Sequence, residues 1–380
     1  MYIVAGEASG DVLGARLIAA LRKLRPELTF TGIGGARMKA ENFTSIFPME
    51  DLAVMGLAEI LPRIFKLRRR LQETVAAIKA QSPAIVVTID SPGFNLRLLK
   101  EIAPLGIKRV QYVAPQVWAW REHRVKKFPG LWDDLLCLLP FEPEFFARHG
   151  IKAHFTGHPV LQSGAEQGDA TRFRAHHNIP PDAPIVVLMP GSRKTEAPRL
   201  LPVFAQTMAR LTKYLPNVVA VIPVSAAVAP VVQAAAASFP TPPILVTNFT
   251  EKHDAYAAAG AALTKSGTST LELALAGVPM AVTYRVNPIT GYLARKLIKV
   301  PYVAMVNLLA GRQLVPELLQ QDCAPQPLAR ALHTLLTDPR AAQSQRTGFA
   351  SVIAALRAPA GDPSTMAAEA VLSVLDRDLG

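Results

Sequence analysis

The stretch Val4-Ala5-Gly6-Glu7-Ala8-Ser9-Gly10-Asp11-Val12-Leu13-Gly14 decides the fold of this chain. Residues 2–4 form a short apolar run typical of a buried strand, and an apolar helical pattern begins at Asp11. The residues between them are small, which lets backbone amides approach a ligand at the start of a helix. We therefore expect a turn that binds a ligand, although a turn that binds nothing is equally consistent with this segment alone. The candidate residues of the turn are Gly6, Glu7, Ser9, Gly10 and Asp11.

Apolar runs of strand length alternate with helical patterns along the rest of the 380-residue chain. This alternation predicts an α/β fold, in which helices cover both faces of parallel sheets. In the first half we expect strands near residues 2–4, 29–32, 85–89, 109–112, 134–138 and 154–156. In the second half we expect them near residues 185–189, 218–222, 244–246, 262–264, 280–283 and 302–304.

A polar stretch at residues 162–182, which runs into a proline-rich turn, is expected to separate two doubly wound sheets. The predicted domains are residues 1–165 and 175–340. Helices at about 340–380 would return to close the first domain, with a last helix near 365–375. Ligands of open α/β sheets bind beyond the carboxyl ends of the strands, so two such domains would form a cleft from these loops.

The composition favours an anionic partner. The formal net charge is +12, 50% of the residues are hydrophobic and 7% are aromatic. A basic balance is typical of proteins that bind nucleic acid, an anionic lipid surface or a phosphorylated substrate. Because the sequence contains no recognisable nucleic-acid-binding module, we expect no nucleic-acid partner.

Cysteine spacing and hydropathy indicate the compartment. Cys137 and Cys323 match no metal-ligand spacing, so we expect thiols in a reducing compartment and no metal site. The first 20 residues carry charges and lack the apolar core of a signal peptide. Residues 214–250 carry no charge, but several prolines interrupt them and alanine dominates. We therefore expect a strand, a helix and a strand there, and no membrane span.

Three further segments follow predicted strands and carry polar groups. Asp90 is suited to act as a general base or to orient a sugar hydroxyl, although it could simply start the next helix. Pro190-Gly191-Ser192-Arg193 offers a glycine turn, a hydroxyl and a cation for a diphosphate, unless it is only a solvated helix start. Lys265-Ser266-Gly267-Thr268 forms a similar turn. Glu272, which follows it, either accepts hydrogen bonds from both hydroxyls of a ribose or simply complements the helix dipole near the start of the helix.

Residues 57–71 combine an apolar helical face with many cations. The apolar face would be made by Leu57, Leu61, Ile64, Phe65 and Leu71, and the cations are Arg63, Lys66, Arg68, Arg69 and Arg70. This pattern indicates a helix that lies in an anionic membrane interface. A surface helix with a solvated basic side is the alternative.

Two other sites have weaker patterns. Val117-Trp118-Ala119-Trp120 precedes several cations, which fits a sugar and phosphate contact as well as a loop packed against the core. His158 follows the last strand of the first half, and we interpret it as a packing residue.

Taken together, these segments resemble glycosyltransferase family 19, the lipid-A-disaccharide synthases. The matching motifs extend from Ala5 to Arg312 in the order of the family. They are Ala5-Gly6-Glu7-Ala8-Ser9-Gly10-Asp11, Met49-Glu50-Asp51-Leu52-Ala53-Val54-Met55-Gly56, Ile89-Asp90-Ser91-Pro92, Val117-Trp118-Ala119-Trp120-Arg121, Leu139-Pro140-Phe141-Glu142, Pro190-Gly191-Ser192-Arg193, Ser266-Gly267-Thr268 and Asn307-Leu308-Leu309-Ala310-Gly311-Arg312. The resemblance implies a GT-B fold, in which two Rossmann-like domains face each other across a cleft.

The resemblance also implies a reaction. UDP-2,3-diacylglucosamine and 2,3-diacylglucosamine 1-phosphate (lipid X) would give the β-1,6-linked lipid A disaccharide 1-phosphate and UDP, with inversion at the anomeric carbon. By its match to the family, Asp90 would be the base or would orient the acceptor, and Arg193 would bind the diphosphate. Asn307 would lie on the nucleotide side, and Glu272 would take the ribose position. The donor site would be completed, without metal or cofactor, by Gly191, Ser192, Ser266, Gly267 and Thr268.

The acylated substrates imply peripheral attachment to the cytoplasmic face of the inner membrane of a Gram-negative bacterium, and family members can form homodimers. The chain departs from the family pattern at three positions. Gly93 stands where Asp is common, Lys265 stands where a small residue is usual, and Gln313 stands where Glu is usual. Met1 is also very close to the first strand, which leaves the start codon open.

Three other interpretations remain at this point. The first is a different GT-B protein that acts on a UDP-sugar, such as a lipid-linked N-acetylglucosamine transferase or a UDP-N-acetylglucosamine epimerase. The second is a nonenzymatic UDP-binding protein of the membrane surface, against which the joint presence of Asp90 and Arg193 counts. The third, from charge alone, is nucleic-acid binding, which predicts salt-sensitive affinity for random DNA.

Overall fold

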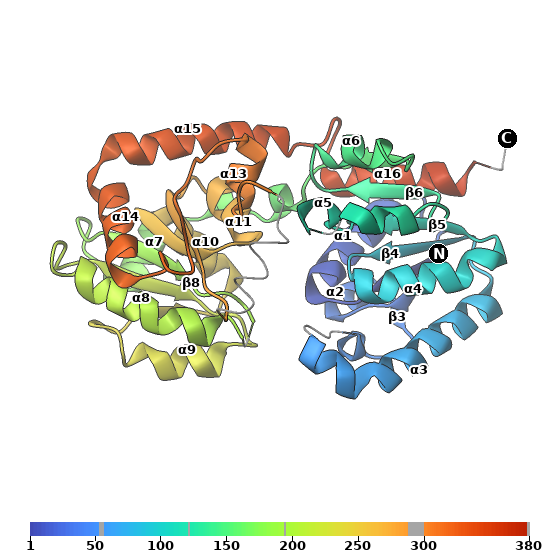
Figure 1. Ribbon diagram of the computed structural model, residues 1–380, viewed down its shortest axis with the longest axis horizontal. Helices are drawn as coiled ribbons and strands as arrows, with labels where there is room; N and C mark the ends of the chain where they lie inside the picture. Colours follow the sequence, from blue (N-terminus) through green and yellow to red (C-terminus); the bar gives the residue numbers. More distant parts are fainter. Residues whose placement is uncertain (53–56, 121, 194, 288–299, 378–380) are drawn as a thin grey trace. The chain divides into compact units, whose positions relative to one another are not determined.

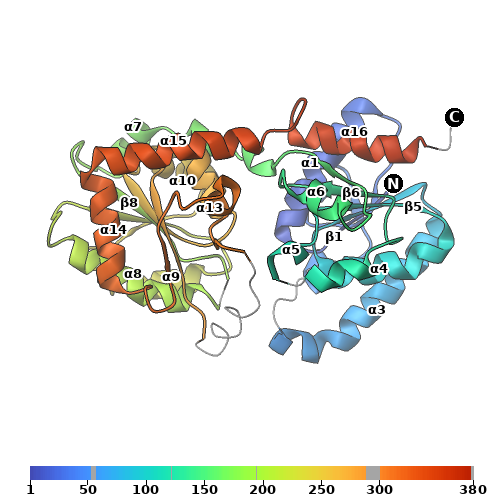
Figure 2. The same ribbon diagram turned by 45° about the horizontal axis from the view of Figure 1, so that its top comes forward.

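The computed structural model describes residues 1–52, 57–120, 122–193, 195–287 and 300–377. The chain divides into two compact units (Figure 1, Figure 2). The first unit combines Met1–Pro159 with Leu356–Gly380, and the second is Val160–Ala355. The division therefore follows the strand β7, before the polar stretch at 162–182, and the first unit is built from two separate parts of the chain.

In the described part of the first unit, seven parallel strands form a sheet of order β3-β2-β1-β4-β5-β6-β7. The strands are β1 (Tyr2–Ala5), β2 (Thr31–Ile33), β3 (Thr44–Ser45), β4 (Ile85–Ile89), β5 (Lys108–Tyr112), β6 (Asp134–Cys137) and β7 (Ala153–Phe155). The α-helices are α1 (Ala8–Leu24), α2 (Ala36–Ala40), α3 (Leu57–Gln81), α4 (Pro92–Ile102), α5 (Val117–Trp120), α6 (Glu142–Ala147) and α16 (Pro363–Leu375). Short 3-10 helices are η1 (Met49–Asp51), η2 (Ala103–Leu105) and η3 (Glu122–Lys127).

In the described part of the second unit, six parallel strands form a sheet of order β10-β9-β8-β11-β12-β13. The strands are β8 (Ile185–Met189), β9 (Val219–Pro223), β10 (Ile244–Val246), β11 (Ala261–Lys265), β12 (Met280–Tyr284) and β13 (Glu317–Leu319). The α-helices are α7 (Ala170–His176), α8 (Ala197–Leu211), α9 (Ala229–Ala236), α10 (Phe249–Ala258), α11 (Ser269–Leu275), α13 (Met305–Ala310), α14 (Pro325–Thr337) and α15 (Pro339–Ala355). The 3-10 helices η4 (Pro159–Gln162) and η5 (Ala165–Gln167) lead into this unit.

Each sheet reverses its strand order at one point. In the first unit the chain moves outward in one direction after β1 and in the other direction after β4, and these two strands are neighbours. In the second unit β8 and β11 are the corresponding neighbours. Loops that follow such a pair diverge to opposite faces of the sheet, which leaves room for a ligand between them. The fold therefore singles out one position in each unit.

Burial explains why the strands were predictable. Every residue of β1, β4 and β6 is buried, because helices cover both faces of a parallel sheet and an uninterrupted apolar run satisfies both. The predicted closing helix is confirmed as α16, which packs against α1 and places Val371 in the core of the first unit. The strand, helix and strand predicted in residues 214–250 are confirmed as β9, α9 and β10.

Some expectations were wrong. The strand expected at 302–304 is absent from this described segment, and the edge strand is β13 instead. The amides of Val303 and Ala304 donate to the Glu317 carboxylate, at 3.0 and 2.9 Å, rather than to a neighbouring strand. β3 was not expected, because two polar residues carry no alternation pattern. Helix α15 belongs to the second unit, although we expected the helices at about 340–380 to close the first.

None of the described helices is both long and apolar enough to cross a membrane.

Candidate active site

The turns after β1 and β4 meet at the switch point of the first unit. Gly6 lies against Ser91: a Cβ atom on Gly6 would be 2.5 Å from the Ser91 Oγ. Gly10 lies 3.4 Å, measured in the same way, from the Cβ of Ala5. A side chain at position 6 would force the two turns apart, so close packing requires Gly6, whereas a Cβ at position 10 would make only an ordinary van der Waals contact. Glu7 is half-buried and precedes α1, where its carbonyl accepts from the Asp11 amide at 2.9 Å.

Asp90 has an unusual backbone conformation. Asp90 and Ser91 both adopt left-handed conformations, with φ of 51° and 43°. Such a conformation costs about 1–3 kcal/mol per residue and persists only where neighbours hold it. Here the Asp90 amide donates to the Tyr112 carbonyl at 2.9 Å, and the Asn95 Nδ2 donates to the Asp90 carbonyl at 2.8 Å. The fold thus fixes the backbone of this residue on both sides.

The Asp90 carboxyl group is held in a state that favours proton uptake. Burial raises its pKa above the ordinary value for aspartate. Hydrogen bonds from the Ser91 amide and the Ser9 hydroxyl oppose part of this rise in the pKa. A carboxylate with a raised pKa, at the switch point and beside a glycine turn, is suited to accept a proton from a bound hydroxyl.

Asp11 serves the structure of the first unit. It is 5% exposed, and its carboxylate accepts hydrogen bonds from the amides of Gly35 (2.8 Å), Arg37 (2.9 Å) and Met38 (3.0 Å). These amides lie at the start of α2, whose own N-cap residue, Gly35, has no side chain to satisfy them. The expectation that Asp11 faces a ligand is therefore corrected: its oxygens already cap a helix 24 residues away.

The turns after β8 and β11 meet at the switch point of the second unit. Gly191 has a φ of 101°, which favours glycine, and a Cβ there would be 2.6 Å from the Glu196 Oε2. The Glu196 Oε1 accepts from the Arg193 Nη1 and from the Lys265 Nζ, both at 3.2 Å. Ser192 is exposed beside this cluster. The predicted cation and the predicted glycine turn are thus together, and an unpredicted carboxylate lies between them.

The neighbouring turn shows how the remaining donor-side residues are placed. The Ser266 hydroxyl donates to the Val303 carbonyl at 2.7 Å, Gly267 has a φ of 152°, and Thr268 is exposed. The Glu272 Oε2 accepts from the Lys252 Nζ at 3.0 Å and from the Tyr256 hydroxyl at 3.3 Å. Glu272 is thus held on α11 by α10, and its role toward a ribose stays a prediction.

Asn307 organises a loop. It is fully buried, and its Nδ2 donates to the Val315 carbonyl at 2.9 Å and to the Glu317 Oε1 at 2.8 Å. Its Oδ1 accepts from the amides of Leu314 and Val315. Both donors and both acceptor positions of the amide are therefore in use. The Asn307 amide therefore holds this loop together, and its role on the nucleotide side stays a prediction.

The exposed end of α3 presents apolar and basic side chains together. Phe65 is 82% exposed and Ile64 is 43% exposed, and Arg68 and Arg69 are exposed beside them. The Leu61 side chain lies outside the described part of the structure. Leu71 was expected on the same face, but it packs against the core of the first unit, so the exposed apolar face is narrower than the sequence suggested.

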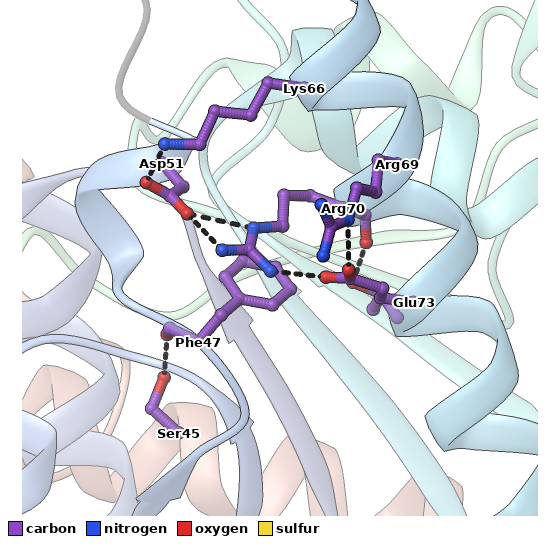
Figure 3. Close-up of polar contacts among 8 residues, drawn as sticks. Ser45, Phe47, Asp51, Lys66, Arg69, Arg70 and Glu73 are labelled. Carbon is purple, nitrogen blue, oxygen red and sulfur yellow. Dashed lines mark hydrogen bonds and ion pairs between the residues drawn. The ribbon is translucent and has the colours of Figure 1, made fainter.

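Two acids neutralise part of the basic side of α3 (Figure 3). Asp51 accepts from Lys66 and from the Arg70 Nη2, the latter at 2.6 Å, and Glu73 accepts from Arg69 and Arg70. The hydrogen bond from Lys66, together with those from Arg70, holds the pKa of Asp51 below its usual value. This network joins α3 to η1, so it fixes the direction in which the exposed side chains point.

Two other predicted positions are structural. The Trp118 Nε1 donates to the buried Glu142 at 3.0 Å, and its ring meets Phe141 edge-on at 4.9 Å, so Trp118 anchors the loop. Burial raises the pKa of Glu142 to about 7, while the hydrogen bonds from Trp118 and two backbone amides oppose the rise. His158 is buried, and burial lowers its pKa to about 4, in keeping with a packing role.

Cys137 and Cys323 are both buried free thiols. Among the described residues, one group has a geometry that could hold a metal ion: His176 and His177 at the end of α7, and Glu251 on α10. The His177 Nε2 and the Glu251 Oε1 are 2.8 Å apart, so a hydrogen bond accounts for this approach. The group does not include the predicted site residues, and the absence of a metal from the reaction stays a prediction.

Sequence reasoning missed two carboxylates of this region, Glu196 and Glu317. Glu196 lies in the same turn as Arg193, and the spacing of three residues between a cation and an acid could have indicated it. Glu317 gave no such signal, because it approaches Asn307 and the amides of the 303–304 segment only after the chain has folded.

Comparison with known proteins shows the family to which the sequence is related. A family model described as lipid-A-disaccharide synthetase matches residues 1–371. The lipid-A-disaccharide synthase of Granulibacter bethesdensis is 59% identical over 386 residues, which cover 99% of this chain and 98% of the relative. That of Gluconobacter oxydans is 58% identical over 376 residues, with 99% and 91% covered.

Solved structures with low sequence identity share the fold. The UDP-GlcNAc 2-epimerase from Neisseria meningitidis bound to UDP-GlcNAc matches with a TM-score of 0.66 and 13% identity, covering 98% of this chain and 99% of that one. CalG4, the calicheamicin glycosyltransferase, matches with a TM-score of 0.60 and 17% identity, covering 100% and 98%. At these identities the likeness concerns the fold alone, which is the GT-B pair of Rossmann-like α/β domains.

Proposed function

Because this chain belongs to the lipid-A-disaccharide synthase family and is a glycosyltransferase of lipid A biosynthesis, we propose that its donor is UDP-2,3-diacylglucosamine. The acceptor is 2,3-diacylglucosamine 1-phosphate (lipid X), which attacks through its 6-hydroxyl. The products are the β-1,6-linked lipid A disaccharide 1-phosphate and UDP. The observation that carries the proposal is the placement of Asp90 and Arg193 at the two switch points.

The first unit supplies the proton acceptor. An inverting transfer needs a base for the acceptor hydroxyl, because the attacking oxygen loses its proton as the new glycosidic bond forms. The raised pKa of Asp90 supports this role, since the protonated product of the step is less disfavoured than for an ordinary carboxylate. Its fixed backbone supports either direct proton removal or orientation of the hydroxyl.

The second unit stabilises the departing UDP. As the bond to the anomeric carbon breaks, negative charge grows on the diphosphate, and a cation fixed beside it stabilises that charge. Arg193 is half-exposed and lies beside the Gly191 turn, where its guanidinium can offer two donors at once. The proposal assigns this task to side chains of the protein and includes neither a metal ion nor a cofactor.

The acylated substrates place the enzyme at a membrane surface. We assign the contact to Ile64, Phe65, Arg68 and Arg69 on α3, at the cytoplasmic face of the inner membrane of a Gram-negative bacterium. Sedimentation with vesicles of phosphatidylglycerol tests the contact: I64S/F65S should bind less, and Y214S, which removes an exposed aromatic ring from the second unit, should bind like the wild type.

The reaction is tested with the purified full chain and both lipid substrates, by UDP release and product mass. Disaccharide phosphate formed by the wild type and lost in folded D90A and R193A supports the proposal. Conversion of UDP-GlcNAc to its 2-epimer without an acceptor would instead favour the epimerase interpretation. UDP binding without any product would favour a nonenzymatic protein of the membrane surface.

A further inference from the structure

Three charged side chains meet between the two glycine turns of the second unit. The buried Glu196 accepts from Arg193 and Lys265 with the same oxygen, Oε1. Each cationic nitrogen is 3.2 Å from that oxygen, so the two cations lie close together. The exposed fractions of the side chains are 8% for Glu196, 17% for Lys265 and 51% for Arg193. The cluster is thus partly buried, with its cations toward the accessible side.

Lys265 lies between the two turns rather than beside one of them. A Cβ on Gly191 would be 3.4 Å from its Cδ, and a Cβ on Gly267 would be 3.5 Å from its Nζ. Its ammonium group also lies 5.9 Å from the centre of the Tyr284 ring. The Lys265 side chain therefore lies between the two glycine turns of the β8–β11 switch point, where the Glu196 carboxylate holds its ammonium group.

The charges of the cluster do not balance. One carboxylate faces two cations, which leaves one excess positive charge. The Glu196 Oε2 is buried and has no hydrogen-bond partner among the residues that the structure describes. A buried carboxylate is costly unless it is paired with a cation, and one cation is enough to neutralise Glu196. The second cation of the cluster therefore has no counter-charge within it. An anion bound between the turns would pair the second cation.

We propose that Lys265 binds the diphosphate of the donor together with Arg193, and that Glu196 is the positioning residue that holds both cations at this switch point. The inference rests on the proposed function, which supplies a nucleoside diphosphate as the ligand. Lysine acts as a point charge toward phosphate, whereas arginine offers a planar pair of donors, so the two side chains can serve different oxygens.

The test compares UDP with uridine, which lacks the diphosphate, by calorimetric titration of the full chain. K265M should weaken UDP binding by about 10-fold or more and uridine binding by less than about 2-fold. K265R should bind UDP within about 3-fold of the wild type, because the charge remains. K213M, which removes an exposed lysine elsewhere in the second unit, is the control and should leave both affinities unchanged.

The double variant E196Q/K265M separates ligand binding from simple neutralisation. If Lys265 binds the diphosphate, the double variant stays at least as weak as K265M, although the buried negative charge has been removed. Recovery of UDP binding in the double variant, or equal losses for UDP and uridine in K265M, would overturn this inference while leaving the proposed function intact. Failure of the wild type to bind UDP would overturn the proposed function, and this inference with it.

Discussion

In the first unit the carboxylate at the switch point meets neutral donors, and in the second unit it meets two cations. Asp90 accepts from a serine hydroxyl and a backbone amide, and burial raises its pKa. Glu196 accepts from Arg193 and Lys265. The switch points of the two units thus carry different chemistry, because the residues around each carboxylate decide its role. One carboxylate is suited to take up a proton, and the other is suited to hold cations in place.

The largest expected effect removes the proton acceptor. D90N should lower kcat by about 100- to 10,000-fold, since it keeps the shape of the side chain but cannot accept the proton. The rate of UDP release in the complete reaction measures it. A loss of kcat below about 10-fold would contradict a role of Asp90 as the base. It would instead favour orientation of the acceptor hydroxyl, which aspartate and asparagine could both perform.

The same variant should be more stable than the wild type at neutral pH. The pKa of Asp90 is raised in the folded state, so its ionisation lowers stability as the pH rises through the unfolded and then the folded pKa. Asparagine removes that penalty. Thermal unfolding should show a higher Tm for D90N at pH 7 and no such gain at a pH below both pKa values.

The next effect tests the cation of the second unit. R193Q should lower kcat/KM by about 100- to 1,000-fold, because the charge on departing UDP loses a fixed donor. R199Q, which removes an exposed arginine from the first turn of α8, should retain activity. Equal losses in the two variants would indicate a general effect of charge and would contradict a specific role for Arg193.

A third test compares two helix-capping aspartates of the first unit, Asp11 and Asp362, by their effect on stability. D11A should lower the free energy of unfolding by about 1–3 kcal/mol, since three backbone amides at the start of α2 lose their acceptor. D362A, which removes the exposed cap of α16, should cost about 1 kcal/mol. Urea unfolding measures both, and kcat of folded D11A should stay near that of the wild type.

The smallest effect adjusts the carboxylate of the first unit. The Ser9 hydroxyl lowers the pKa of Asp90, so S9A should raise that pKa further and move the acid limb of the profile of kcat/KM against pH upward. Activity at the acid end should fall by about 2- to 10-fold. An unchanged acid limb would mean that another group controls it.

The sequence predicted the sheets well, and the reason is physical. Strands such as β4 and β8 are apolar on both faces because both faces are covered, and this gives a continuous run that is easy to recognise. The strand expected at residues 302–304 has the same apolar character. Its amides bind the Glu317 carboxylate instead, and that acid is 14 residues from Val303. Apolar character alone does not reveal such a partner.

The candidate site was predictable where its chemistry is local to one turn. Asp90 directly follows β4, and Arg193 lies in the turn that follows β8, so their placement at a switch point required only the strand order. Asp11 shows the opposite case, because it lies beside the glycine turn in sequence but caps α2 through a contact across 24 residues. The pairing of Lys265 with Glu196 spans 69 residues and needed the structure.

The discontinuous first unit also bears on how the chain folds during synthesis. Residues 1–159 emerge before the second unit, but the face of α1 that α16 covers stays open until the last helix leaves the ribosome. Lys108 then donates to the Leu375 carbonyl at 2.7 Å, and Val371 and Val374 enter the core. The first unit is therefore the first to be made and the last to be completed, and a chain that stops after the second unit leaves an apolar surface exposed for other chains to bind.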